Sequence, residues 1–156
     1  ALHLLRSMPL AEAVPDVVSF NASVSACERG GQWQVALQII SDTYAARLMP
    51  NTISYTAGIS ACEKGGEWQL ALRLLSELPA ARLVANELSY SSAISACQKN
   101  NRWQTAVRLL LDMAATRVLP NVITLGSGIS ACEKAGQLSI VRRLLSDMLM
   151  CVMRFF

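Results

Sequence analysis

Apolar residues recur along the chain with helical spacing, in blocks that repeat every 35 residues. In the first complete block, Phe20, Val24 and Cys27 are separated by four and then three positions, which places them on one side of an α-helix. The same stripe returns three times, as Tyr55-Ile59-Cys62, Tyr90-Ile94-Cys97 and Leu125-Ile129-Cys132. The pattern predicts one amphipathic helix at the start of each block.

A second apolar stripe follows in every block. In the first block it contains Trp33, Ala36, Leu37 and Ile40, again at helical spacing. We expect this second helix to stop near four equivalent positions, which are Thr43, Leu78, Met113 and Met148. Pro79 lies just past one of these positions and would hinder continuation of the helix.

Helix boundaries are indicated by small polar residues. A hydroxyl residue precedes each first stripe and is expected to act as its N-cap; the four are Ser19, Ser54, Ser89 and Thr124. Residues that tolerate a left-handed conformation follow each first helix, and they are Gly30-Gly31, Gly65-Gly66, Asn100-Asn101 and Ala135-Gly136. Each block therefore predicts a helix, a tight turn, a second helix and a short loop.

A fixed period in this range is typical of repeat arrays, in which neighbouring units bury each other's apolar faces. The predicted fold class is all-α. The chain divides into the second helix of an incomplete repeat at 1–16, repeats at 17–51, 52–86 and 87–121, and a fourth repeat at 122–156 with a divergent end. Because the sequence begins within a repeat and without Met, we expect it to be a fragment, with any targeting segment upstream.

Composition agrees with an ordered array. Hydrophobic residues make up 53% of the 156 residues and charged residues 16%, which argues against disorder. The net charge of +3 permits an anionic partner without requiring one. Polar residues interrupt every apolar run before it reaches 18 positions, so no membrane span is expected.

The cysteines and the single histidine offer little chemistry. Equivalent cysteines in stacked repeats should lie about 8–10 Å apart, which is too far for a disulfide or a shared zinc ion. We therefore expect Cys27, Cys62, Cys97 and Cys132 to be buried thiols, while Cys151 lies outside the pattern and receives no role. His3 has no suitable nucleophile, and there is no phosphate-binding glycine loop. We expect no catalysis, no cofactor, no metal and no small-molecule substrate.

Four kinds of surface position also recur with the repeat. Polar or small residues near the start of the first helix are Asn21, Thr56, Ser91 and Gly126. Polar residues at the end of the preceding unit are Asp16, Asn51, Asn86 and Asn121. Apolar residues one position before the hydroxyl residue are Val18, Ile53, Leu88 and Ile123, and basic residues closing the first helix are Arg29, Lys64, Lys99 and Lys134. Taken singly, each could serve only a turn, a cap or the helix dipole, but their joint recurrence favours one binding surface.

A repeat of the form VVSFNASVSACERGGQWQVALQIISDTYAARLMPN resembles the pentatricopeptide repeat (PPR) family of organellar RNA-binding proteins. The resemblance extends over the whole chain except the last residues, LMCVMRFF. The related tetratricopeptide repeat has a shorter period and a different signature. Membership of this family implies a right-handed superhelical solenoid.

The resemblance also implies roles for the recurring residues. Each repeat would read one base through its fifth and last residues, here Asn21/Asn51, Thr56/Asn86 and Ser91/Asn121. The apolar set (Val18, Ile53, Leu88, Ile123) would separate the bases, and the basic set (Arg29, Lys64, Lys99, Lys134) would contact phosphates. By the family's pairing rules the preferred sequence is 5′-C(or U)-A-A-3′. Gly126 and Phe156 depart from the pattern, so no specificity is expected in the fourth repeat, and Asp16 lacks its partner.

The function implied is sequence-specific binding of single-stranded RNA in organellar RNA processing, stability, editing or translation. The implied location is a plastid or mitochondrion, and other RNA-processing proteins are possible partners. The alternative is a protein-interaction scaffold without RNA binding, which would not require the polar pairs or the basic column.

Overall fold

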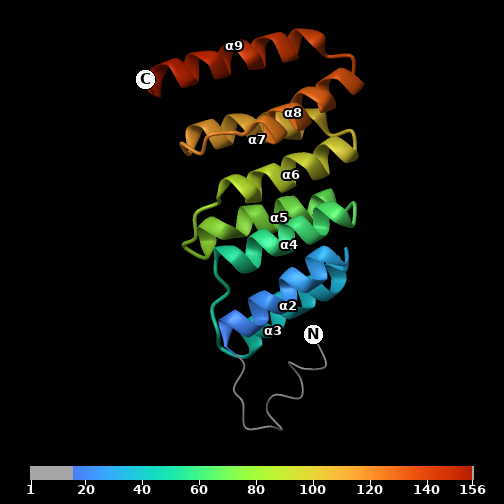
Figure 1. The fold of residues 1–156 in the computed structure, drawn as a ribbon, viewed down its shortest axis with the longest axis vertical. Helices are drawn as coiled ribbons and strands as arrows, with labels where there is room; N and C mark the ends of the chain where they lie inside the picture. The colour runs from blue at the N-terminus through green and yellow to red at the C-terminus, as the bar shows by residue number, and fades with distance from the viewer. Residues whose placement is uncertain (1–15, 156) are drawn as a thin grey trace. The chain divides into compact units, whose positions relative to one another are not determined.

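The computed structural model describes residues 16–155, with side-chain burial described for 16–147 and 150. These residues form α-helices joined by short turns, and no strand occurs among them (Figure 1). The helices are α2 (Val17–Arg29), α3 (Trp33–Ala45), α4 (Thr52–Lys64), α5 (Trp68–Ala80), α6 (Glu87–Lys99), α7 (Trp103–Ala115), α8 (Val122–Lys134) and α9 (Leu138–Phe155). The predicted all-α class is confirmed. The predicted helix within 1–16 lies outside the described residues apart from Asp16, as does Phe156.

The helices form two compact units, Ala1–Ala85 and Asn86–Phe156. In the first unit, α2 packs against α3 and α4, and α4 packs against α5. In the second unit, α6 packs against α7 and α8, and α8 packs against α9. Each unit therefore places the first helices of two consecutive blocks beside each other. Over the described residues, no helix is long and apolar enough to cross a membrane.

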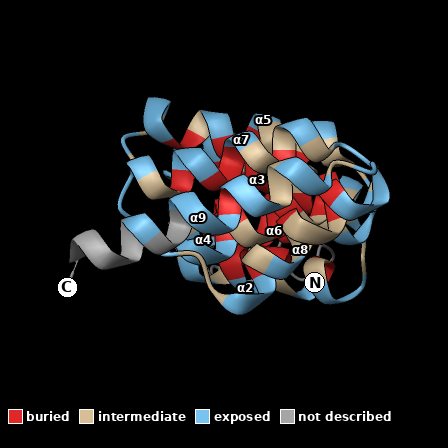
Figure 2. Cartoon of the chain, turned by 90° about the horizontal axis from the view of Figure 1, so that it is seen from above, coloured by how far each residue is buried: buried red, intermediate tan, exposed pale blue. Residues whose placement is uncertain are grey.

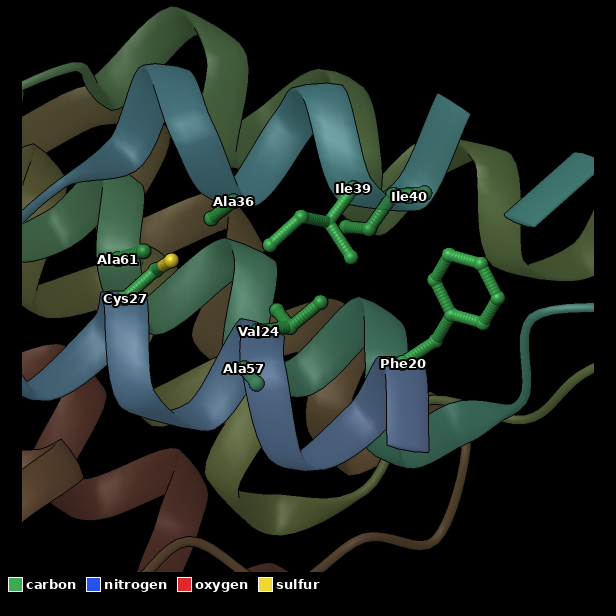
Figure 3. Close-up of a cluster of buried hydrophobic side chains, with 8 residues drawn as sticks. All are labelled: Phe20, Val24, Cys27, Ala36, Ile39, Ile40, Ala57 and Ala61. Atoms are coloured by element: carbon green, nitrogen blue, oxygen red, sulfur yellow. The ribbon is translucent and has the colours of Figure 1, made fainter. Parts of the chain in front are cut away.

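The core of the first unit forms from the two predicted stripes and the next first helix (Figure 3). Phe20, Val24 and Cys27 of α2 face a set of apolar residues from α3 and α4, which are Ala36, Ile39, Ile40, Ala57 and Ala61. Buried residues recur on one side of α2 and of α3, whereas every residue of α4 from Ser54 to Cys62 is buried (Figure 2). Cys27, Cys62, Cys97 and Cys132 are free and buried, as predicted.

The N-caps differ from the sequence prediction. The helices begin two residues before the predicted hydroxyl caps, and the capping residues are Asp16, Asn51, Asn86 and Asn121. Ser19, Ser54, Ser89 and Thr124 are instead third residues of their helices, and the backbone N–H of each donates to the cap. The assignment of these four residues as N-caps was wrong, because an Asp or Asn three positions earlier starts the helix and accepts from the N–H of the hydroxyl residue itself.

The turn after each first helix matches the prediction. Gly31, Gly66 and Gly136 have φ of 64°, 78° and 69°, and Asn101 takes the equivalent conformation with φ of 55°. The backbone N–H of the next residue then reaches back to the helix, as in the 2.9 Å bond from Glu67 N to Cys62 O. This left-handed residue ends the helix and lets the second helix begin two residues later.

The second helices end later than predicted. α3, α5 and α7 end at Ala45, Ala80 and Ala115, two residues beyond the expected stops. Pro79 lies inside the last turn of α5. The expectation that this proline would end the helix at the preceding residue was therefore wrong. The expected stop near Met148 was also wrong, because no Gly or Pro occurs in α9, which continues to Phe155.

What ends these second helices is a left-handed arginine. Arg47, Arg82 and Arg117 have φ of 57°, 57° and 59°. The following backbone N–H closes the turn, for example from Leu83 N to Leu78 O over 2.9 Å. A side chain with a Cβ carries a conformational cost in this region, so these ends are strained relative to a glycine cap.

Trp33, Trp68 and Trp103 are half-buried and are not fully enclosed in the core. Trp33 packs against the edge of the core cluster shown in Figure 3. Its indole also covers Gly65 in the turn of the next block, where an added Cβ would lie 2.2 Å from Trp33 Cδ1. The glycine therefore permits close contact between consecutive blocks.

Candidate nucleic-acid interface

The predicted base-separating residues lie on the surface of the first helices. Val18, Ile53, Leu88 and Ile123 are 72%, 60%, 58% and 69% exposed. Each is the second residue of its helix, so its position at the start of the helix is set by the Asp or Asn cap just before it. Four large apolar side chains at the same helical position are thus excluded from the core, and each exposes apolar surface to solvent.

The predicted reading residues of the first complete repeat meet each other in the first unit. Asn21 Nδ2 donates to Asn51 Oδ1 over 3.1 Å, and Ser54 Oγ donates to Asn21 Oδ1. Asn51 Oδ1 also accepts from Ile53 N and Ser54 N over 3.0 and 3.2 Å, which caps α4. Asn21 is only 9% exposed, so a base edge can reach this pair only by replacing some of these hydrogen bonds.

The equivalent residues of the second unit are more open. Ser91 is half-buried on α6. Asn121 Oδ1 caps α8 by accepting from Thr124 N over 2.7 Å, while Asn121 Nδ2 donates to Glu87 Oε1. The amide oxygen thus serves the helix, and the amide nitrogen faces a carboxylate that a ligand could displace.

The remaining predicted reading residues divide by position. Thr56 is 5% exposed and lies on α4 of the first unit, whereas Asn86 caps α6 in the second. Apart from its chain neighbours and the backbone of its own helix, Gly126 has no atom within 4 Å of the place a Cβ would take, so that position is open. Hydrogen bonds from the backbone N–H and the hydroxyl of Ser19 lower the pKa of Asp16, which holds it as an ionised cap.

The predicted phosphate-contacting residues lie at the other end of the same helices. Arg29, Lys64, Lys99 and Lys134 each lie in the last turn and are exposed. Eight positions separate Asn21 from Arg29, which corresponds to about 12 Å along the helix axis. A strand crossing this surface would therefore meet apolar and polar groups at one end of the helix and cations at the other.

One set of contacts at this cationic end was missed from the sequence. Ser60 Oγ donates to Glu28 Oε1 over 2.9 Å, and Lys64 Nζ lies 3.1 Å from the same oxygen. In the second unit, Gln98 occupies the position of Glu28 and donates to Ser130 Oγ over 3.3 Å. The recurrence of Glu or Gln before each basic residue was the available signal.

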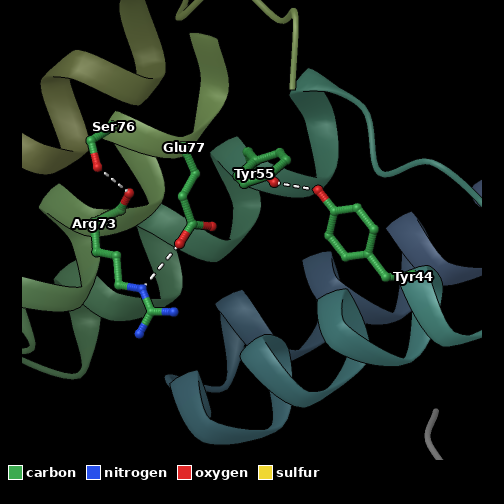
Figure 4. A network of polar contacts seen from close by, with 5 residues as sticks. All are labelled: Tyr44, Tyr55, Arg73, Ser76 and Glu77. Carbon is green, nitrogen blue, oxygen red and sulfur yellow. Dashed lines mark hydrogen bonds and ion pairs between the residues drawn. The ribbon is translucent and has the colours of Figure 1, made fainter. Parts of the chain in front are cut away.

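The second helices carry a different surface. A hollow between α3 and α5 is lined by residues that include Leu37, Leu70 and Leu74, and the equivalent residues Val107, Ile140 and Leu144 line one between α7 and α9. Beside the first hollow, the Tyr44 and Tyr55 hydroxyls lie 2.5 Å apart, and Arg73 pairs with Glu77 over 3.0 Å (Figure 4). Burial raises the pKa of Tyr55.

Over the described residues, no three His, Cys, Asp or Glu side chains are arranged to hold a metal ion.

Comparison with known families places this architecture in a class. The pentatricopeptide repeat domain family matches residues 3–67, and the PPR repeat family matches 53–82 and 88–115. These matches cover more than half of the chain, which therefore belongs to the pentatricopeptide repeat family. A comparison with curated protein sequences gave no match.

Solved structures of the same fold agree. The chain is similar to the pentatricopeptide repeat protein PPR10 from maize, with a TM-score of 0.83 and 21% identity over 93% of this chain and 21% of that one. It is also similar to the PPR domain of Arabidopsis thaliana protein-only RNase P 1 in complex with tRNA, with a TM-score of 0.81 and 15% identity over 97% and 80% of the two chains. PPR10 in complex with an 18-nt psaJ RNA element gives a TM-score of 0.74 at 21% identity, again over 93% and 21%. These likenesses show an α-helical repeat solenoid, and the chain spans about a fifth of the length of PPR10.

Proposed function

We propose that this chain binds single-stranded RNA along the exposed surface of its first helices, without catalysis of its own. The observation that carries the proposal is the exposure of Val18, Ile53, Leu88 and Ile123 beside polar capping residues. Family membership supports it, as do the fold relatives crystallised with RNA, maize PPR10 with a psaJ element and the Arabidopsis PPR domain with tRNA.

The exposed apolar residues supply the part of the affinity that does not depend on sequence. An aliphatic side chain can lie against the face of any base, because every base has an apolar π-face. Removing both surfaces from water is favourable, whereas leaving four large aliphatic groups exposed gives the free protein no stability. The bases would lie between these side chains, with one repeat for each base.

The polar residues supply the base preference. The Oδ1 atom of Asn51 is used in capping α4. The Nδ2 atom of the same side chain can donate a hydrogen bond to a base. Cytosine presents acceptors at N3 and O2, which suit such a donor. Asn21 Nδ2 can turn from Asn51 to the base, so one hydrogen bond replaces another at small net cost.

The preferred sequence follows from the family's pairing rules for these residues. The Asn21/Asn51 pair selects C or U, and Thr56/Asn86 and Ser91/Asn121 each select A, giving 5′-C(or U)-A-A-3′. Gly126 contributes no side chain and therefore no preference. Arg29, Lys64, Lys99 and Lys134 contact phosphates, which makes the affinity depend on salt.

The biological setting is part of the same proposal. Binding of this kind serves RNA processing, stability, editing or translation in a plastid or mitochondrion, together with other RNA-processing proteins. Catalysis, where it occurs in such a system, belongs to those partners or to appended domains.

Equilibrium binding of labelled RNA oligomers tests the proposal. Oligomers containing CAA should bind more tightly than scrambled ones, and the affinity should fall as salt rises from 50 to 200 mM. Leu88→Ala should weaken binding roughly fivefold by removing a base contact. Leu119→Ala is the matched control, because Leu119 is also 58% exposed but does not lie at the second position of a first helix. Equal affinity for all oligomers, with no salt dependence, would favour a protein-interaction scaffold instead.

A further inference from the structure

The cationic end of the first helices differs between the two units in one respect. In the first unit, Glu28 of α2 reaches the neighbouring helix α4, accepting a hydrogen bond from Ser60 Oγ over 2.9 Å and pairing with Lys64 Nζ over 3.1 Å. Lys64, a predicted phosphate contact, is therefore already paired with a carboxylate in the free protein.

The second unit has the same arrangement with the charge removed. Gln98 takes the position of Glu28 on α6, and its Nε2 donates to Ser130 Oγ of α8 over 3.3 Å. The side chain of Lys134, the equivalent of Lys64, makes no hydrogen bond or ion pair with any other described residue. The Gln98 side chain has nearly the same size as that of Glu28 and keeps the contact with a serine. Because it carries no charge, it leaves Lys134 without the carboxylate partner that Lys64 has.

We infer that the residue before the basic position tunes the phosphate contact of the following repeat: Glu28 weakens the contact of Lys64, and Gln98 makes Lys134 a stronger one. This inference rests on the proposed RNA binding and adds residues to it. It assigns Glu28 and Gln98 as determinants of affinity, although neither lies at a base-reading position.

Two electrostatic effects act in the same direction. A phosphate must first displace the Glu28 carboxylate from Lys64, and an exposed ion pair of this kind corresponds to about a 1.4- to 5-fold change in an equilibrium constant. The displaced carboxylate then remains beside the phosphate, and two like charges at short range repel. Gln98 is uncharged and causes neither effect. Its Nε2 is a donor that can turn from Ser130 to a phosphate oxygen.

The decisive experiment exchanges the two residues in the full chain. Glu28→Gln should tighten binding of a CAA-containing RNA oligomer by roughly two- to fivefold at about 50 mM salt, and Gln98→Glu should weaken it by a similar factor. Glu133→Gln is the matched control, because Glu133 occupies the same helical position and its replacement changes the net charge equally. Glu133 has no ion-pair or hydrogen-bonding partner among the described side chains, so only the general charge effect should remain.

A second set of variants tests the link to the lysines. Lys134→Ala should weaken RNA binding more than Lys64→Ala does in the wild-type background. In the Glu28→Gln background, the effect of Lys64→Ala should grow, and in the Gln98→Glu background the effect of Lys134→Ala should shrink. Unchanged helical circular dichroism shows that each variant is folded.

The outcomes separate the two proposals. If the wild-type chain prefers CAA but Glu28→Gln and Glu133→Gln have the same effect, the tuning role is overturned while RNA binding stands. If no oligomer binds at any salt concentration, the proposed function fails, and the tuning role fails with it.

Discussion

The side-chain amide nitrogen of Asn21 donates a hydrogen bond to Oδ1 of Asn51 over 3.1 Å, although 30 positions separate the two residues. The bond joins the body of α2 to the N-terminal cap of α4. Asn51 thereby has two roles in one side chain, because its oxygen caps a helix and its amide belongs to the predicted base-reading pair. A substitution that keeps the capping oxygen of Asn51 and removes its amide nitrogen therefore separates helix stability from base recognition.

Asn51→Asp makes that separation. Asp and Asn cap helices about equally well, so the free energy of unfolding should change by less than about 0.5 kcal/mol. The variant loses the Nδ2 donor and gains an acceptor, which disfavours cytosine and favours uracil, whose N3–H can donate. Titrations with CAA and UAA oligomers should show this shift at the first nucleotide only.

Asn51→Ala is the comparison for that experiment. It removes the cap as well as the donor, and it should cost about 1 kcal/mol in unfolding free energy in addition to the loss of preference. A preference unchanged in both variants would show that Asn51 is a structural residue alone.

Gly65 and Gly30 occupy the same place in consecutive blocks, but only Gly65 lies under a tryptophan. A Cβ at Gly65 would lie 2.2 Å from Trp33 Cδ1, whereas at Gly30 the nearest atoms are at 3.7 Å. Gly65→Ala should therefore destabilise the chain by about 1–3 kcal/mol in chemical denaturation. Gly30→Ala, with a negative φ and open space, should be neutral or stabilise by up to about 1 kcal/mol. Equal effects of the two changes would contradict the stacking of Trp33 on this turn.

The buried thiols predict a dependence of stability on alkaline pH. Burial raises the pKa of Cys62 and of Cys97 from 9.0 to about 11. Between these values the unfolded chain loses thiol protons that the folded chain keeps, so the free energy of unfolding should fall as pH rises from 9 to 11. Denaturant titrations across that range should show a shallower fall in a Cys62→Ala/Cys97→Ala variant. Identical slopes would mean that the two thiols ionise equally well in the folded state.

Replacing a left-handed arginine by glycine should stabilise the folded chain. Arg82 has φ of 57°, a region that glycine enters without steric cost. Arg82→Gly should raise the free energy of unfolding by about 0.5–1 kcal/mol. Ala81→Gly provides the control, since φ at that neighbour is −81° and glycine should lower stability there. A loss of stability in the Arg82 variant would show that the arginine side chain, and not its backbone, is important.

The helical framework was predictable because its signal is periodic. The Phe20-Val24-Cys27 stripe and the paired glycines fix where each first helix lies and where it ends. The N-caps were ambiguous for a physical reason. Asp16 and Ser19 are both capping types, and only the structure shows the Ser19 hydroxyl donating to Asp16 Oδ1 over 2.9 Å.

Other features depend on packing that a single sequence does not encode locally. No residue preference points to a left-handed arginine at position 47, 82 or 117, because arginine does not favour that conformation. The Glu28–Lys64 pair joins residues one repeat and one position apart, so it depends on how α2 and α4 are offset. The roles of the base-reading residues came from family resemblance and remain predictions.

The most direct test changes one reading residue and follows one nucleotide. Ser91→Asn converts the Ser91/Asn121 pair into the combination found at Asn21/Asn51. Affinities for CAA, CAC, AAA and CCA oligomers should then show that the third nucleotide alone changes, with CAC overtaking CAA. A variant that alters the preference at every nucleotide, or at none, would contradict recognition of one base by each repeat.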